Sequence, residues 1–280
     1  MNIVYFGTDV FLSTFQYLLK EHNILALYTY HNREDFFTEQ NIVKLAHMHK
    51  IPVCYEKIIK KRIDYYFQYL KCDLFYLAEY CYKLPVPADL PDFKAVNVHS
   101  SLLPAGRSYY PIECAMKRKM SESGITIHKL SDQIDCGDIL IQRTLPIQQS
   151  DDSIDIYLKC AAAAEDMTKE LMTGFSDYWD HAARQKDNMP YWKRPPEKDM
   201  MITHGMSVSE AKEIYRCYNK MTKVSIHGQL YFLDSFMPGN MPIGNTDRDI
   251  IVVRDNRIIY GLRDGNIRID IEAAEKQGKA

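Results

Sequence analysis

The chain has 280 residues, of which 46% are hydrophobic and 26% are charged, and its formal net charge is -2. This is the composition of a globular protein with one large core and room for a second, smaller one. It excludes a strongly basic surface, so we expect no nucleic-acid partner. The seven cysteines lack metal-knuckle or redox spacing, and we find no leader-like segment and no run of about 18 apolar residues. We therefore expect a cytoplasmic protein with reduced thiols and no membrane contact.

The first part of the chain alternates short apolar runs with helical patterns. Residues 2–6 and 24–30 predict strands, and between them apolar residues recur at the spacing of a helix. The alternation continues with a helix near 38–49, strands near 52–54 and 73–77, and a helix near 57–70. Strands that alternate with helices of this length predict a Rossmann-like parallel sheet covered on both faces, with ligands at the carboxyl ends of its strands.

The pattern changes towards the C-terminus. The sequence first predicts a strand at 95–99, a helix near 110–119, strands near 124–130 and 138–142, and a helix near 152–174. A polar, proline-rich stretch and a short helix at 207–219 follow, and from 222 to 272 apolar residues alternate with period two between turn signals. We expect an α/β catalytic domain over 1–190, a connector over 191–206, and a small, mostly antiparallel, OB-like β domain over 207–280.

Two polar residues stand on one face of the predicted strand 95–99. Asn97 and His99 are two positions apart, so both project to the same side near the carboxyl end of the strand. Asp135 lies in a polar loop after the strand 124–130 and can return to a histidine at a neighbouring strand end. An amide, an imidazole and a carboxylate can stabilise an oxyanion and move a proton without any metal. From these residues alone, the plainer interpretation of satisfied polar residues at a strand end stays open.

Several segments taken together resemble one enzyme family. They are "NVHSSLLP" (97–104), Arg107, Pro111-Ile112, "GITIH" (124–128) and "DCGDIL" (135–140). In order and spacing the chain is similar to the N10-formyltetrahydrofolate-dependent formyltransferases, which include methionyl-tRNA, glycinamide ribonucleotide and sugar N-formyltransferases. The resemblance implies a formyltransferase with Asn97, His99 and Asp135 as its catalytic residues.

The resemblance also implies where the formyl donor, N10-formyltetrahydrofolate, binds. The implied pocket uses the loop after the preceding strand and the loop before Asp135, with contacts from Cys81, Tyr82, Leu84, Ser131, Asp132 and Ile134. Much of the pterin recognition in such sites uses backbone groups, so the departure of residues 78–85 from the family pattern is tolerable. A hydrolase that releases formate and a non-catalytic folate- or nucleotide-binding module remain as alternatives.

The acceptor side is where this sequence departs most from the family. The family often has Arg-Gly before the next proline, whereas here Arg107-Ser108-Tyr109-Tyr110 precedes Pro111. Aromatic faces suit sugar rings and bases, and a guanidinium can bind a diphosphate through two parallel hydrogen bonds. We favour a nucleotide-linked amino sugar as acceptor, as used in lipopolysaccharide or glycan biosynthesis. The acceptor contacts we expect are Gly7, Thr8, Arg107, Tyr109, Trp192 and Arg194.

The main alternative acceptor is methionyl-tRNA. In the methionyl-tRNA formyltransferase a small barrel-like domain also follows the transferase domain. The near-neutral C-terminal part of this chain argues against it, because phosphate contacts dominate affinity for nucleic acids. The sequence leaves open whether an apolar face of the C-terminal sheet forms a homodimer.

Overall fold

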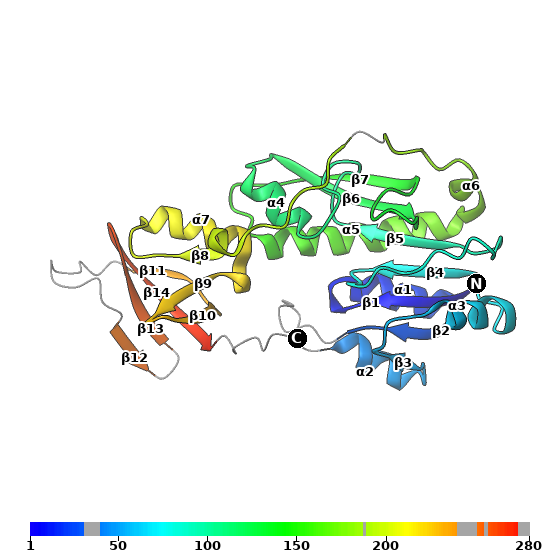
Figure 1. Cartoon of the computed structure of the whole chain (residues 1–280), viewed down its shortest axis with the longest axis horizontal. Coiled ribbons are helices and arrows are strands. Elements are labelled where there is room, and N and C mark those ends of the chain that lie inside the picture. The colour runs from blue at the N-terminus through cyan, green and yellow to red at the C-terminus, as the bar shows by residue number, and fades with distance from the viewer. Residues whose placement is uncertain (31–39, 187–188, 240–250, 255–256, 274–280) are drawn as a thin grey trace. The chain divides into compact units, whose positions relative to one another are not determined.

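A computed structural model describes residues 1–30, 40–186, 189–239, 251–254 and 257–273 (Figure 1). The chain divides into two compact units: Met1–Gln148 with Asp155–Lys193, and Gln149–Ile154 with Arg194–Ala280. The stretch that we predicted as a connector is thus shared between them, because residues 191–193 belong to the first unit. Within the described ranges, we find no helix whose length and apolar character would let it cross a membrane.

The described residues of the first unit form a seven-stranded sheet in the order β3-β2-β1-β4-β5-β6-β7. Its strands are β1 (Asn2–Gly7), β2 (Asn23–Tyr28), β3 (Val53–Cys54), β4 (Leu74–Ala78), β5 (Ala95–His99), β6 (Glu122–Lys129) and β7 (Ile139–Pro146). The strands from β3 to β5 are parallel, which confirms the Rossmann-like prediction. β6 and β7 run antiparallel to their neighbours, a direction that the sequence pattern did not indicate. The chain re-enters the sheet at Glu122, beyond the end of β5, and then runs back along it.

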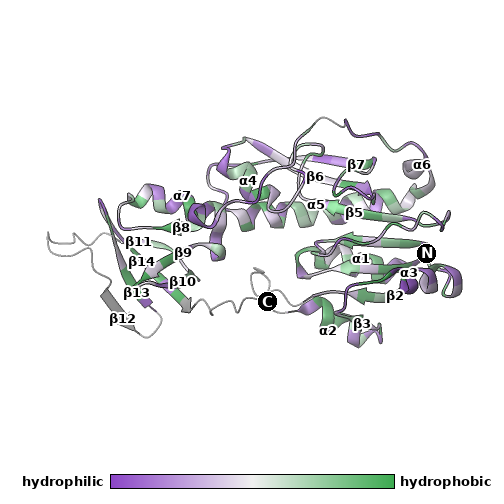
Figure 2. Ribbon diagram, in the orientation of Figure 1, coloured by the Kyte–Doolittle hydropathy of each residue, from purple (hydrophilic) through white to green (hydrophobic). Residues whose placement is uncertain are grey.

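Helices pack on both faces of this sheet. Phe75 contacts the rings of Tyr66 and Phe67 on one face, whereas its neighbour Tyr76 bonds Thr168 on the other. The helical elements are η1 (Asp9–Phe11), α1 (Leu12–Glu21), α2 (Asn41–Met48), α3 (Lys60–Asp64), the π-helical turn η2 (Tyr65–Tyr69), α4 (Pro111–Lys117), α5 (Ser153–Thr173) and α6 (Phe175–Asp180). Figure 2 shows the central strands as largely hydrophobic, as strands buried on both faces must be.

The second unit is built around another sheet. Its described strands are β8 (Met201–Ile202), β9 (Lys223–Ile226), β10 (Gln229–Leu233), β11 (Met237–Gly239), β12 (Ile251–Arg254), β13 (Arg257–Leu262) and β14 (Gly265–Ala273), with η3 (Glu197–Met200), α7 (Val208–Tyr218) and η4 (Asn219–Met221). Their order is β12-β13-β14-β10-β9-β8, with β11 paired to β14. The described pairs are antiparallel apart from β8 with β9, which confirms a mostly antiparallel sheet. An OB-like barrel stays a prediction.

Alternate residues of these strands form the core of the second unit. Val224, Ile258, Ile267 and Ile269 are buried together with Ala211 of α7. The helix begins at a capping box, in which the Ser207 hydroxyl accepts from the Glu210 N–H and the Glu210 carboxylate accepts from the Ser207 N–H. The period-two pattern therefore marks the inward face of the sheet, as the sequence predicted.

Candidate active site

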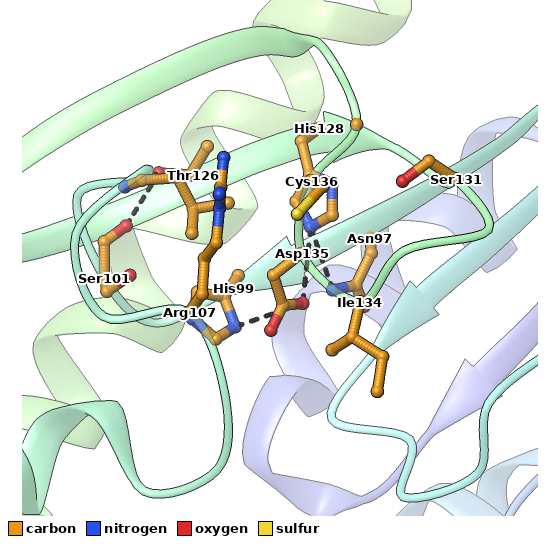
Figure 3. A network of polar contacts seen from close by, with 12 residues as sticks. Asn97, His99, Ser101, Arg107, Thr126, His128, Ser131, Ile134, Asp135 and Cys136 are labelled. Atoms are coloured by element: carbon orange, nitrogen blue, oxygen red, sulfur yellow. Dashed lines mark hydrogen bonds and ion pairs between the residues drawn. The ribbon is translucent and has the colours of Figure 1, made fainter. Parts of the chain in front are cut away.

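The residues of the candidate site meet where β5 and β6 lie side by side. In the register of this pair, Asn97 faces His128 and His99 faces Thr126. The loop of residues 130–138 leaves β6 beside Val96, close to the start of β5, and folds back towards His99. Figure 3 shows Asp135 turned towards the rings of both His99 and His128. The structure thus brings Asn97, His99 and Asp135 together, as the sequence predicted.

The His99 ring is oriented through both of its nitrogens. Nε2 lies 2.8 Å from the carbonyl oxygen of Gly106, and because a carbonyl can only accept, Nε2 carries a proton and donates it. Nδ1 faces Asp135 Oδ1 at 3.7 Å, while Asp135 Oδ2 accepts from the Ser108 N–H at 3.0 Å. The ring is 8% exposed. Nδ1 is therefore the ring nitrogen that faces the carboxylate and can exchange a proton in the site.

His128 fixes the side chain of Asn97. Its Nδ1 donates to the carbonyl oxygen of Lys129 at 2.8 Å, so in the neutral ring Nε2 is an acceptor. Asn97 Nδ2 lies 3.1 Å from this Nε2 and donates to it. Burial lowers the pKa of His128 to about 4, against the opposing effect of Asp135, so the ring is neutral at pH 7. The second N–H of the Asn97 amide remains to serve a ligand.

Side chains of β6 and β7 hold the loop that follows β5. The Thr126 hydroxyl donates to the Ser101 carbonyl at 2.7 Å and accepts from the Leu103 N–H at 3.2 Å. Gln142 Nε2 donates to the Leu103 carbonyl at 2.9 Å and to the Thr126 hydroxyl at 2.8 Å. These bonds fix the path of the chain towards Gly106, whose carbonyl holds His99. Our sequence analysis did not identify Thr126 or Gln142.

Arg107 has a different environment from the one we expected. It is 3% exposed, and its Nε and Nη2 donate to Gln185 Oε1 at 3.2 and 2.8 Å. Nη2 also lies 3.3 Å from the carbonyl oxygen of Lys186. The guanidinium is therefore engaged inside the protein rather than presented to a ligand, which runs against the diphosphate contact predicted from sequence.

The loop after β1 has structural tasks. A Cβ on Gly7 would lie 2.2 Å from the Ala78 carbonyl oxygen, so glycine is needed for close packing against β4. Thr8 is 6% exposed and its hydroxyl accepts from the N–H of Val10. The Asp9 carboxylate accepts from the first N–H groups of α2 at 2.6 and 2.8 Å and so caps that helix. Contact of Gly7 and Thr8 with the acceptor stays a prediction.

The other predicted acceptor residues divide by exposure. Tyr109 is 57% exposed on the loop after β5 and is free to meet a ligand. The Trp192 ring packs beneath the Arg118 guanidinium, with 4.3 Å from Cζ to the ring centre, and the Trp192 N–H donates to the Arg107 carbonyl. Trp192 thus anchors its segment to the loop after β5. Arg194 is exposed and belongs to the second unit.

The predicted donor contacts also divide by exposure. Ile134 is 43% exposed, Tyr82 is 40% exposed, and Asp132 and Cys81 are exposed as well. The Ser131 hydroxyl donates within its own loop, to the Gln133 carbonyl at 2.7 Å. Leu84 is 2% exposed and packs into the core with Phe6, so its side chain faces the protein interior. Within the described ranges, no group of three or more His, Cys, Asp or Glu residues could hold a metal ion.

Comparison with known proteins identifies the family. A family model described as formyl transferase matches residues 29–171, more than half of the chain. The chain belongs to the formyl transferase family. The recognition of the family from the "NVHSSLLP" and "DCGDIL" segments is confirmed.

Solved structures support the same fold for this formyl transferase. HypX from Aquifex aeolicus, in complex with tetrahydrofolic acid, is 15% identical with a TM-score of 0.70, over 98% of this chain and 44% of that one. This chain thus spans less than half the length of HypX. The sugar 3N-formyl transferase WlaRD, solved in the presence of dTDP and 5-N-formyl-THF, is 18% identical with a TM-score of 0.60, over 99% and 98% of the two chains. The N-formyltransferase from Helicobacter canadensis, in complex with folinic acid and dTDP-3-aminofucose, is 19% identical with a TM-score of 0.62, over 96% and 98%.

Proposed function

We propose that this enzyme transfers the formyl group of N10-formyltetrahydrofolate to the amine of a nucleotide-linked amino sugar. The observation that carries the proposal is the meeting of Asn97, His99 and Asp135 around one point at the β5–β6 pair. Two similar structures, WlaRD and the Helicobacter canadensis enzyme, were solved with a folate and with dTDP or a dTDP-linked amino sugar, and each is nearly as long as this chain. The ligands of these two structures favour a nucleotide-linked amino sugar as the acceptor.

The surroundings of Asn97, His99 and Asp135, which we call the triad, suit a flat, partly aromatic donor. Ile134 directly precedes Asp135 and leaves 43% of its surface open, and Figure 3 shows its side chain beside Asp135 and Asn97. An exposed apolar side chain next to buried polar groups is what a ligand with a ring and a polar reacting end requires. We propose that the pteridine end of the donor lies against the loop of residues 130–138, with the formyl group between Asn97 and His99.

In the first step the neutral amine of the acceptor attacks the formyl carbon. The free N–H of Asn97 Nδ2 and a proton on His99 Nδ1 stabilise the negative charge that develops on the formyl oxygen. His128 keeps the Asn97 amide turned with its N–H groups available, because its neutral Nε2 accepts one of them. No reorganisation of these donors is then needed during the reaction.

In the second step a proton moves from the attacking amine to N10 of the donor. Asp135, held by the Ser108 N–H, accepts the proton from the amine nitrogen, directly or through a water, and passes it to N10. The bond between the formyl carbon and N10 breaks, tetrahydrofolate leaves, and the acceptor keeps the formyl group as an amide. The separation of 3.7 Å between His99 Nδ1 and Asp135 Oδ1 is longer than a hydrogen bond, and we expect it to shorten in the complex with substrates.

A screen of acceptors tests the proposal. The protein is incubated with N10-formyltetrahydrofolate and a panel of nucleotide-linked amino sugars, with initiator Met-tRNA as a separate arm, and products are read by mass. We expect an amino sugar that gains the mass of one CO unit, and no gain with a His99→Asn variant. Formylation of Met-tRNA alone would replace the proposed acceptor, and formate release without any acceptor would indicate a hydrolase. A cytoplasmic location, a role in glycan or lipopolysaccharide biosynthesis and a homodimer remain predictions.

A further inference from the structure

We propose that Gln185 is a positioning residue for the triad, through a clamp that its amide forms between the two loops of the site. The proposal rests on the proposed function of Asp135 and His99. Gln185 lies beyond residues 29–171, which the family model matches, and in a polar stretch that carries no motif. It is nevertheless 4% exposed, which is unusual for a glutamine.

Both ends of the Gln185 amide are occupied. Nε2 donates to the carbonyl oxygen of Asp135 at 3.0 Å and to that of Gly137 at 2.7 Å. Oε1 accepts from Nε and Nη2 of Arg107 at 3.2 and 2.8 Å. The two N–H groups and the oxygen are thus all used, and one side chain joins the loop of Asp135 to the loop after β5.

The loop of Asp135 needs such a contact because its backbone is held in an uncommon conformation. Asp135 has φ 54°, in the left-handed region that residues with a side chain rarely adopt. Two residues later the chain passes so close to β6 that a Cβ on Gly137 would lie 1.7 Å from the Lys129 carbonyl oxygen. Gln185 Nε2 bonds the carbonyl groups of both these residues and so holds the turn that aims the Asp135 carboxylate.

Arg107 connects Gln185 to the loop after β5, which holds His99. It stands between Gly106, whose carbonyl accepts from His99 Nε2, and Ser108, whose N–H donates to Asp135 Oδ2. A shift of Arg107 along its loop would therefore move a partner of the imidazole and a partner of the carboxylate together. Gln185 fixes Arg107 and the Asp135 backbone with the same amide, so it sets the distance between His99 Nδ1 and Asp135 Oδ1.

The isosteric variant Gln185→Glu separates two explanations. A carboxylate would keep the acceptor for Arg107 and strengthen that contact by charge. It would also place an oxygen against the carbonyl oxygens of Asp135 and Gly137 in place of a donor. A residue needed merely to anchor Arg107 tolerates this change, whereas a residue that positions Asp135 does not.

The first test compares kcat in two backgrounds. We expect Gln185→Glu to lower kcat about 100-fold, the cost of a misplacement of about 1 Å, with the donor KM within about threefold of the wild type. In an Asp135→Asn background the same change should cost less than about threefold, because the group that it positions is already lost. An equal loss in both backgrounds, or a kcat within about twofold of the wild type in the native background, would overturn the proposal.

The second test does not depend on activity. Exchange of the Ser108 amide hydrogen is followed by NMR, because this N–H bonds Asp135 Oδ2 when the loop is in place. We expect Gln185→Glu and Gln185→Ala to speed the exchange at least about tenfold, and we expect the same of Asp135→Ala, which removes the acceptor. The matched control is Thr168→Val, which removes a fully buried hydroxyl of α5 that bonds Tyr76 and the Ala164 carbonyl but no residue of the two site loops, and exchange should stay near the wild-type rate.

The two tests separate the clamp from the proposed function. Unchanged exchange in both Gln185 variants would exclude the clamp whatever the enzyme catalyses. If the wild-type protein transfers no formyl group to any acceptor, the proposed function fails, and the exchange measurement still decides whether Gln185 holds the loop. If Gln185→Glu does not fold, Gln185→Ala carries both measurements.

Discussion

The first unit of this protein buries more charged or ionisable polar side chains than the second. Around the β5–β6 pair the first unit encloses charged or ionisable groups, among them His99, Arg107, Glu113 and His128. Among the described residues of the second unit, Asp151 is the buried charged side chain, and the other buried polar side chains are small and neutral: Ser153, Ser207, Asn219, Thr222 and Asn266. Burying an ionisable group costs free energy unless it is paired, so such groups persist where the chemistry needs them. The buried ionisable groups of the first unit thus gather around the site that we propose for the reaction, whereas the core of the second unit is mainly aliphatic.

The largest expected effect is on the triad. His99→Asn removes the ring nitrogen that faces Asp135, and we expect kcat to fall roughly 1,000-fold, about 4 kcal/mol of transition-state stabilisation. The fold should stay intact, although the lost ring volume and the lost bond to the Gly106 carbonyl should lower the melting temperature. Steady-state kinetics and thermal melting measure the two quantities on one sample. Near-normal turnover by this variant would mean that the reaction does not depend on His99.

A substitution in the core of the second unit should lower stability and leave activity nearly unchanged. Ile267 is fully buried among the aliphatic residues of β14, and Ile267→Ala should lower the free energy of unfolding by about 3 kcal/mol through lost burial and a cavity. Well below the melting temperature, kcat should remain within about twofold of the wild type. Ile259→Ala, at a half-buried position of β13, is the control and should cost less than half as much. A tenfold loss of kcat in the Ile267 variant would show that the second unit takes part in the site.

Local patterns were enough to predict most of the fold. The period-two pattern after residue 222 marks strands of the second unit, and the alternation before residue 80 marks four parallel strands in the first. The direction of β6 could not be predicted, because a short helix such as α4 fits both a crossover and a return along the same edge. The helix predicted at 57–70 is also interrupted: α3 gives way at Tyr65 to a π-helical turn that packs Tyr66 and Phe67 into the core. Such changes depend on tertiary packing rather than on spacing.

The candidate site shows where sequence reasoning stops. Asn97, His99 and Asp135 could be predicted to meet, because they fall in family-like segments near strand ends. Gln185 could not, since it stands in the polar run Arg-Gln-Lys-Asp-Asn and its role depends on contacts with residues 48 to 78 positions away. The reverse holds for Arg107: its position on the loop was predicted, but its burial against Gln185 depends on a fold that no local pattern reports.

Two buried groups of the first unit, His128 and Glu113, make stability depend on pH in opposite directions. His128 has a pKa lowered to about 4, so its contribution to stability is present above about pH 6.5 and is lost as the pH falls towards 4. Glu113 of α4 is fully buried, with Tyr157 donating to its Oε1 at 3.2 Å, and burial raises its pKa to about 7. The folded state then holds a proton that the unfolded state has released, so stability is lost as the pH rises from about 4.5 through 7.

The smallest expected effect follows from this second group. Glu113→Gln keeps the oxygen that accepts from Tyr157 but cannot ionise, so the variant should lack the loss of stability above pH 4.5 that the wild type shows. Between pH 5 and 8 the free energy of unfolding of the variant should rise by about 2 kcal/mol relative to that of the wild type, since one pKa unit corresponds to about 1.4 kcal/mol. Urea unfolding at each pH measures it, and the His128 contribution cancels because both proteins contain that residue. The exposed Glu122→Gln is the control, and a constant difference between Glu113→Gln and the wild type over this range would mean that Glu113 is not the buried acid of the first unit that titrates.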